Sequence, residues 1–141
     1  MFSKKARMSY DVRTFTLKQS QMKKLLLFFL LFSCTEKKEM MSLSPEDFNA
    51  KYKSTSNAIL LDVRTDEEVK EGALPHAQNI VYDDSFANKL ESLSKEAPIF
   101  VYCAAGKRSA KAAEIMKAKG FKKVYQLKGG LNAWKDAKLP L

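Results

Sequence analysis

From residue 44 onward, short apolar runs alternate with longer amphipathic stretches. The runs at 58–61 and 99–102, Ala-Ile-Leu-Leu and Ile-Phe-Val-Tyr, are almost continuously hydrophobic. That pattern is typical of strands whose two faces are both buried. Weaker runs of the same kind lie at 78–81 and 124–127. Because strands that alternate with helices need crossover connections, this order predicts an α/β fold with a mainly parallel sheet.

Helical patterns fill the gaps between these runs. The first helix is expected to begin at Ser44-Pro45, because serine caps a helix well and proline fits the first helical position. Further helical stretches are expected at 66–70, 85–93, 107–119 and 131–136. In the stretch 107–119, the small residues Ala112 and Ala113 fall on the apolar face, which predicts that this helix packs closely against the sheet.

The first third of the chain has a different pattern. Met22-Lys23-Lys24 precedes eight consecutive apolar residues, 25–32, which are followed by Ser33-Cys34. Eight residues rise about 12 Å as a helix, well short of the ~30 Å hydrocarbon core of a bilayer, so a transmembrane span is not favoured. A basic start, a short apolar core and a small residue before the cysteine are typical of a secretory signal.

The tetrapeptide Leu31–Cys34 resembles a bacterial lipoprotein signal, in which the cysteine is lipidated and becomes the mature N-terminus. The resemblance implies a signal peptide at 22–33, a lipidated Cys34 that begins a tether at 34–43, and a location on the periplasmic side of the cell envelope. The alternatives are export without lipidation and an uncleaved leader. Residues 1–21 place polar sequence ahead of the signal, so we interpret them as an upstream extension and Met22 as the candidate start.

The net charge of +9 over 141 residues points at first to a nucleic-acid or membrane partner. Residues 1–33, however, hold seven basic side chains and one acidic side chain, a net +6. The other 108 residues hold 18 basic and 15 acidic side chains, a net +3. These charges are interleaved, and no basic stripe carries aromatic residues, so nucleic-acid binding is not expected. Membrane contact is expected only through the lipid anchor.

The small number of cysteine and histidine residues limits metal and disulfide chemistry. Two cysteines and one histidine cannot build a disulfide-rich scaffold or supply an ordinary four-ligand structural zinc site. If Cys34 is lipidated, Cys103 is the one remaining thiol of the exported domain and has no intramolecular disulfide partner.

Cys103 lies where the run 99–102 ends and the loop to the next helix begins. In parallel α/β sheets, ligands bind at this carboxyl end of the strands. The free N–H groups at the start of the helix and the cations Lys107 and Arg108 favour a thiolate over a thiol. Gly106 permits a tight turn. We therefore expect a reactive sulfur that is ionised and open to solvent; the alternative is an inert, buried cysteine at a strand end.

Three groups of residues occur together between residues 44 and 141. They are Asp62-Val63-Arg64 with Glu68 and Gly72, the loop Cys103-Ala104-Ala105-Gly106-Lys107-Arg108-Ser109, and Gly129-Gly130-Leu131-Asn132-Ala133-Trp134. In type and order they resemble the single-domain rhodaneses, in particular the short periplasmic sulfurtransferases. The resemblance covers the domain predicted at 44–141 and implies a three-layer fold, in which helices flank a mainly parallel sheet of four to five strands.

The resemblance also implies a ping-pong sulfurtransferase. Cys103 takes a sulfane sulfur from thiosulfate or a similar anionic donor, becomes a persulfide, and passes the sulfur to cyanide or a thiol, including a protein thiol. The backbone N–H groups that cradle the outer sulfur are those of Ala104, Ala105, Gly106, Lys107, Arg108 and Ser109. The two cations attract the donor. No metal or organic cofactor is implied, and the domain is expected to act as a monomer.

Three further polar residues receive supporting roles from the same resemblance. Asp62 and Arg64 are expected to brace the cysteine loop, with Glu68 as a partner for Arg64. The alternative is an ordinary ion pair at the surface, which contributes little to stability.

Trp134 and His76 are the two remaining candidates for a role in the site. Trp134 is expected in the core, because Leu131 precedes it by three residues on the same helical face. His76 is the single histidine, and we do not expect it to act as a catalytic base.

Two other classes of function stay open. Some rhodanese-like domains lack the cysteine and serve as non-enzymatic docking modules, an interpretation against which Cys103 argues. Phosphatases and arsenate reductases also hold an anion in a cysteine loop, but five residues separate their cysteine and arginine, whereas four separate Cys103 from Arg108. The shorter loop favours a single sulfur atom over a phosphate group.

Overall fold

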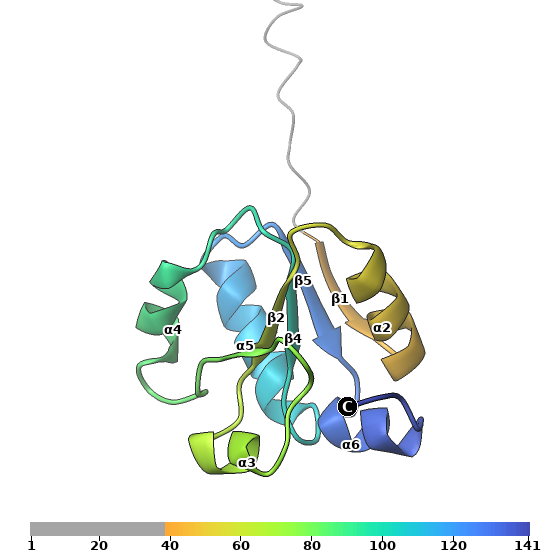
Figure 1. Cartoon of the computed structure of the whole chain (residues 1–141). Helices are drawn as coiled ribbons and strands as arrows, with labels where there is room; N and C mark the ends of the chain where they lie inside the picture. Colours follow the sequence, from red (N-terminus) through yellow and green to blue (C-terminus); the bar gives the residue numbers. More distant parts are fainter. Residues whose placement is uncertain (1–38) are drawn as a thin grey trace, which may run out of the picture. The chain divides into compact units, whose positions relative to one another are not determined.

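Five parallel strands form the centre of the computed structural model, which describes residues 39–141 (Figure 1). The strands are β1 (Glu39–Leu43), β2 (Ile59–Asp62), β3 (Gln78–Asn79), β4 (Ile99–Tyr102) and β5 (Lys123–Leu127). Their order across the sheet is β1-β5-β4-β2-β3, and every neighbouring pair is parallel. The predicted α/β fold with a parallel sheet is confirmed. The predicted signal peptide and Cys34 lie outside the described residues and stay predictions.

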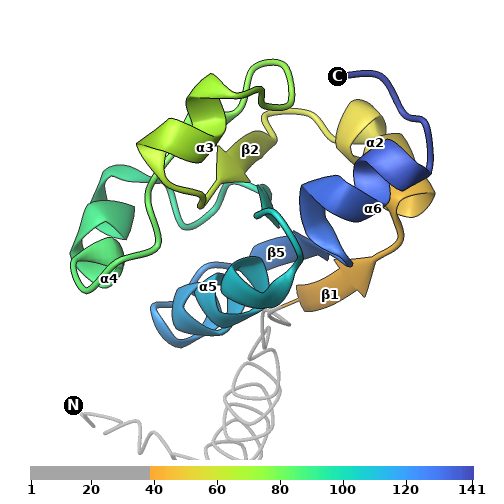
Figure 2. The same cartoon turned by 90° about the horizontal axis from the view of Figure 1, so that it is seen from below.

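Helices cover both faces of this sheet. They are α2 (Pro45–Ser54), α3 (Asp66–Lys70), α4 (Phe86–Lys89) with a following 3₁₀ turn (Leu90–Ser92), α5 (Lys107–Ala118) and α6 (Gly130–Asp136). Figures 1 and 2 show α4 and α5 on one side and α2 and α6 on the other. Within residues 39–141, no helix is both long and apolar enough to cross a membrane.

Alternation along the strands divides the interior into two cores, because successive side chains point to opposite faces of a sheet. The core on the α5 side includes Leu61, Ile99, Val101, Val124, Ala112, Ala113 and Met116. The core on the other side includes Leu60, Phe100, Tyr125, Leu131, Phe48 and Trp134. Trp134 is thus a core residue, as predicted. The alanines of α5 pack close to the sheet, which was also expected from their position on the helix.

The strand β1 was not predicted. It takes up Glu39–Leu43, part of the segment expected to be a tether, and pairs along its whole length with β5. Its residues lack a clear strand pattern because β1 is an edge strand with two exposed residues, Met41 and Ser42. The pairing with β5 joins segments that are more than eighty residues apart, which local patterns do not reveal. The tether prediction is therefore wrong for these five residues.

Local signals in the sequence explain where several other elements begin. The Ser44 hydroxyl accepts a hydrogen bond from the Asp47 N–H (3.2 Å), and Pro45 begins α2. The predicted helix 85–93 is shorter than expected, because α4 gives way to a 3₁₀ turn at Leu90. The run 78–81 forms only the two-residue strand β3. Beyond it, the Ile80 N–H still donates to the Asp62 carbonyl (3.0 Å).

Candidate active site

Cys103 continues the alternation of β4. Ile99 and Val101 point toward α5, and Cys103, two residues further, joins the same core. Only 1% of the residue is exposed. The expectation of a sulfur open to solvent is therefore wrong for this structure, because the strand geometry directs the side chain under the start of α5 rather than outward.

The loop after Cys103 aims two backbone N–H groups at the sulfur. Gly106 N–H and Ser109 N–H donate to Cys103 Sγ at 3.1 and 3.4 Å. The Cys103 Sγ also lies 3.5 Å from the Ser109 hydroxyl oxygen, to which it donates in its thiol form. Gly106 adopts φ +86°, a left-handed conformation that glycine adopts readily. Donors at the start of α5 form a site for negative charge on sulfur.

The start of α6 holds the other side of the loop. Leu131 N–H donates to the Cys103 carbonyl (2.8 Å), and Asn132 N–H donates to the Ala104 carbonyl (3.0 Å). Gly130, with φ +64°, makes this approach possible, because a Cβ atom there would overlap those two carbonyl groups. The glycine pair in the third sequence motif thus fixes the position of the cysteine loop. Ala105, at its tip, is exposed.

Gln126 is a buried polar side chain in the site that was not predicted. Its Nε2 donates to the Ser109 hydroxyl (3.0 Å) and to the Gly106 carbonyl (3.3 Å). Its Oε1 accepts a hydrogen bond from the Ser42 hydroxyl of β1 (2.6 Å). The sequence did contain a signal for this residue. Gln126 follows Val124 by two positions and so lies on the same, core-facing side of β5, where a buried side-chain amide needs hydrogen-bond partners.

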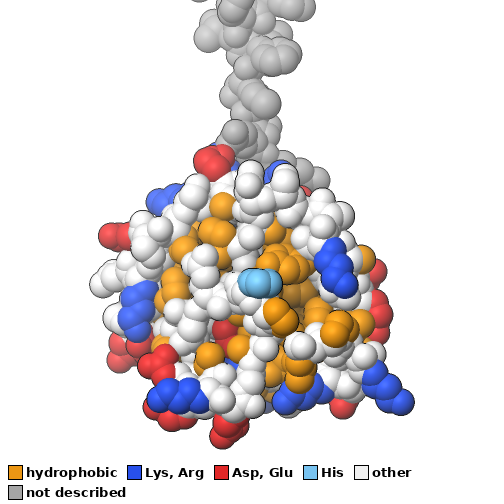
Figure 3. All heavy atoms as spheres, in the orientation of Figure 1, with side chains coloured by type: hydrophobic (Ala, Val, Ile, Leu, Met, Phe, Trp, Pro, Cys, Tyr) orange, Lys and Arg blue, Asp and Glu red, His pale blue; other side chains and the backbone are white. Residues whose placement is uncertain are grey.

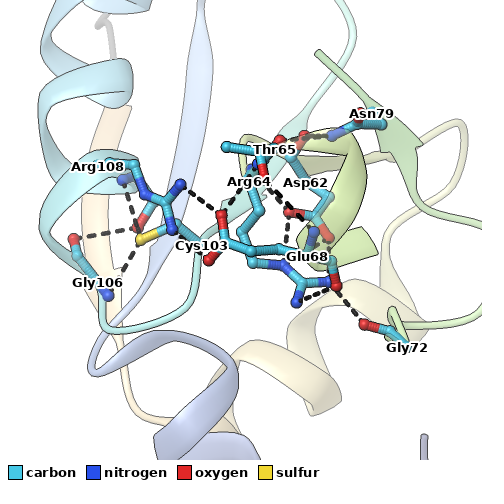
Figure 4. A network of polar contacts seen from close by, with 10 residues as sticks. Asp62, Arg64, Thr65, Glu68, Gly72, Asn79, Cys103, Gly106 and Arg108 are labelled. Atoms are coloured by element: carbon cyan, nitrogen blue, oxygen red, sulfur yellow. Dashed lines mark hydrogen bonds and ion pairs between the residues drawn. The ribbon is translucent and has the colours of Figure 1, made fainter. Parts of the chain in front are cut away.

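The two cations of the loop have different environments. Lys107 is exposed, whereas Arg108 forms a two-pronged ion pair with Glu68 of α3, with both N–O distances at 2.7 Å (Figure 4). The hydrogen bond from Arg108 lowers the pKa of the Glu68 carboxyl to about 2, and the same contact raises the pKa of Arg108. Sequence reasoning paired Glu68 with Arg64; its carboxylate instead binds Arg108.

Arg64 has a different partner. Its guanidinium binds the Asp62 carboxylate, with the shortest N–O distance at 2.7 Å, and both side chains are almost completely buried. Arg64 also donates to the carbonyl groups of Glu68 (3.0 Å) and Gly72 (2.7 Å). The pair is therefore not a surface ion pair. It ties the end of β2 to the middle of α3 and to the turn that follows this helix, and so it fixes the helix that carries Glu68 (Figure 4).

His76 lies apart from the cysteine. It lines an apolar pocket of about 210 Å³ between α2, α6 and the C-terminal residues, on the opposite side of the sheet from α5. Figure 3 shows its exposed ring among hydrophobic side chains. No described contact joins His76 to the Cys103 loop, in keeping with the expectation that it is not a catalytic base.

Comparison with known proteins agrees with this arrangement. Residues 44–137 match the model of the rhodanese-like domain family. The chain is 33% identical over 102 residues to YtwF of Bacillus subtilis, whose name marks it as a candidate sulfurtransferase; the match covers 72% of this chain and 97% of that protein. It is 26% identical over 99 residues to a sulfurtransferase of Allochromatium vinosum, covering 70% of this chain and 92% of that protein.

A solved structure shows the same fold. A rhodanese-like domain protein from Staphylococcus aureus has a TM-score of 0.60 and 34% sequence identity, and the match covers 67% of this chain and 91% of that one. The chain belongs to the rhodanese-like domain family, whose relatives include proteins named as sulfurtransferases.

Proposed function

We propose that this protein is a sulfurtransferase in which Cys103 carries the transferred sulfur as a persulfide. The observation that supports the proposal most directly is the pair of N–H groups, from Gly106 and Ser109, directed at Cys103 Sγ. Such donors stabilise negative charge on the thiolate before the reaction. They stabilise it again on the thiolate that is released when the sulfur leaves.

Thiosulfate is the donor that we propose for the first half-reaction. The Cys103 thiolate attacks the outer, sulfane sulfur of thiosulfate and forms a new S–S bond. The original S–S bond breaks, and its electron pair leaves with sulfite. One thiolate and one thiosulfate dianion thus become one persulfide anion and one sulfite dianion, so that charge and electrons balance without an added oxidant or reductant.

Cyanide or a thiolate accepts the sulfur in the second half-reaction. The acceptor attacks the outer sulfur of the persulfide, and the S–S bond electrons return to Cys103 as a thiolate. The products are thiocyanate or a new persulfide. No step needs a group outside the chain and the two substrates. A protein thiol fulfils the same chemical requirement as a small thiol.

Steady-state kinetics of the purified full chain with thiosulfate and cyanide test this proposal. We expect thiocyanate to form with parallel double-reciprocal lines, the pattern of a covalent intermediate that forms before the acceptor binds. Cys103→Ser should abolish turnover, whereas Cys34→Ser should leave it unchanged. Intersecting lines, turnover by Cys103→Ser, or aryl phosphate hydrolysis faster than sulfur transfer would reject the proposal.

A further inference from the structure

Glu68 forms an ion pair with the guanidinium of Arg108, the group on which an anionic donor would depend. Arg108 lies on the first turn of α5, five residues after Cys103, and its pKa is raised mainly by the hydrogen bond to Glu68 and also by the nearby Cys103. Figure 4 shows its side chain beside Cys103, extending toward Glu68. Both terminal nitrogens of the guanidinium bind the Glu68 carboxylate at 2.7 Å. The edge formed by the two terminal nitrogens, one of those that bind an oxyanion in a bidentate manner, is therefore already filled.

Glu68 is held in this position by contacts of its own. Its Oε2 accepts a hydrogen bond from Thr65 N–H (3.0 Å), and its backbone carbonyl accepts one from Arg64 (3.0 Å). The depressed pKa of about 2 keeps the carboxyl ionised throughout the neutral range. About one third of each side chain, Glu68 and Arg108, is exposed, so a small molecule in solution can reach the pair.

Of the two other cations near the loop, Arg64 is taken up by a buried ion pair with Asp62, and Lys107 lies at the surface at the start of α5. An incoming dianion thus meets the Glu68 carboxylate and the cysteine thiolate as like charges, and it has to compete with Glu68 for the terminal nitrogens of Arg108. An uncharged molecule is not repelled by these two negative charges, and it does not depend on Arg108 for binding.

We propose that Glu68 is a specificity-determining residue: its carboxylate binds the terminal nitrogens of Arg108, offsets the charge of the guanidinium, and disfavours small anionic reactants at Cys103 relative to uncharged ones. As a statement about donors, this rests on the proposed sulfur transfer. It then implies that thiosulfate is a weaker donor than it would be without the Glu68 carboxylate, and that donors of lower charge are favoured.

Two alkylating agents that differ in charge but react in the same way test this proposal. Iodoacetate is an anion and iodoacetamide is neutral, and both react with a thiolate through the same methylene carbon. The rate of alkylation at Cys103 is measured for each reagent in the full chain by mass spectrometry of the Cys103 peptide. Glu68→Gln keeps the size of the side chain and an oxygen for Thr65 N–H, but it removes the charge.

We expect Glu68→Gln to raise the ratio of the iodoacetate rate to the iodoacetamide rate by about threefold to tenfold, as for removal of one partly screened charge. The KM for thiosulfate should fall with little change in kcat. Glu67→Gln is the matched control, because Glu67 is an exposed neighbour on α3 and its loss changes net charge equally. Thermal unfolding reports whether each variant folds, and Glu68→Ala carries the same test if the glutamine variant does not fold.

An unchanged or lower ratio in a folded Glu68 variant overturns the proposal, as does an equal rise in Glu67→Gln. The alkylation test does not need sulfur transfer. A raised ratio without any persulfide from thiosulfate would therefore reject the proposed function but support the proposal that the Glu68 carboxylate disfavours anionic reactants. Persulfide formation with an unchanged ratio would do the reverse.

Discussion

At the scale of single residues, Glu68 links the stability of the fold to pH. Its carboxyl has a pKa of about 2 in the folded protein, because Arg108 donates to it, against 4.5 for an unperturbed group. The folded state therefore binds a proton at Glu68 less readily than the unfolded chain does. The stabilisation from the ion pair is present above the unfolded pKa and is lost as the pH falls through the folded value.

We predict that Glu68→Gln is less stable than the wild type at pH 6 and that the difference shrinks steadily between about pH 5 and pH 2. The comparison of the two proteins isolates Glu68 from other carboxyl groups that titrate over the same range. Urea unfolding midpoints measured at several pH values provide the test. A difference that stays constant over the whole range would show that the ion pair does not set this pKa.

At the scale of secondary structure elements, two helix starts form the cysteine loop. α5 supplies the N–H groups that reach the sulfur, and α6 supplies those that hold the carbonyls of Cys103 and Ala104. Gly130 lies where α6 approaches the loop most closely. The geometry of the sulfur site therefore depends on a residue that does not contact the sulfur.

We predict that Gly130→Ala displaces the loop, because the new Cβ would overlap the carbonyl groups of Cys103 and Ala104. The expected cost is about 1–3 kcal/mol of stability, together with a roughly 10- to 100-fold loss of sulfur transfer. Gly120→Ala is the matched control: Gly120 also has a positive φ (+96°), but it lies at the far end of α5. Equal losses of transfer in the two variants would contradict this account.

The elements were predictable to the extent that their signals are local. The capping residues of α2 and the apolar run of β4 define those elements within the sequence itself. The strand β1 was missed, because only its pairing with β5 makes Glu39–Leu43 a strand. The position of Cys103 at a strand end was predictable for the same reason as β4. The side-chain contacts around the cysteine loop were less predictable. The pairing of Glu68 with Arg108, for example, joins residues forty positions apart and depends on how α3 packs against α5.

At the scale of the whole molecule, the sheet places the reactive group at the carboxyl ends of its central strands. β4 lies between β5 and β2, so that Gln126 from one neighbour contacts the cysteine loop, and the Asp62–Arg64 pair at the end of the other holds the helix that carries Glu68. The same arrangement buries the sulfur on the α5 side of the sheet. Burial of Cys103 follows from the alternation of β4 and the close packing of α5, two features that the sequence indicated, whereas the charged loop after the cysteine favoured an exposed sulfur.

The central claim is that Cys103 carries a second sulfur atom. Intact-mass spectrometry of the full chain after thiosulfate treatment tests it most directly, with peptide mapping to locate the added atom. We predict that the wild type gains one sulfur atom on Cys103 and loses it on addition of cyanide, with an equal amount of thiocyanate released, and that Cys103→Ser gains none. No gain in the wild type, or an equal gain in Cys103→Ser, would contradict the account.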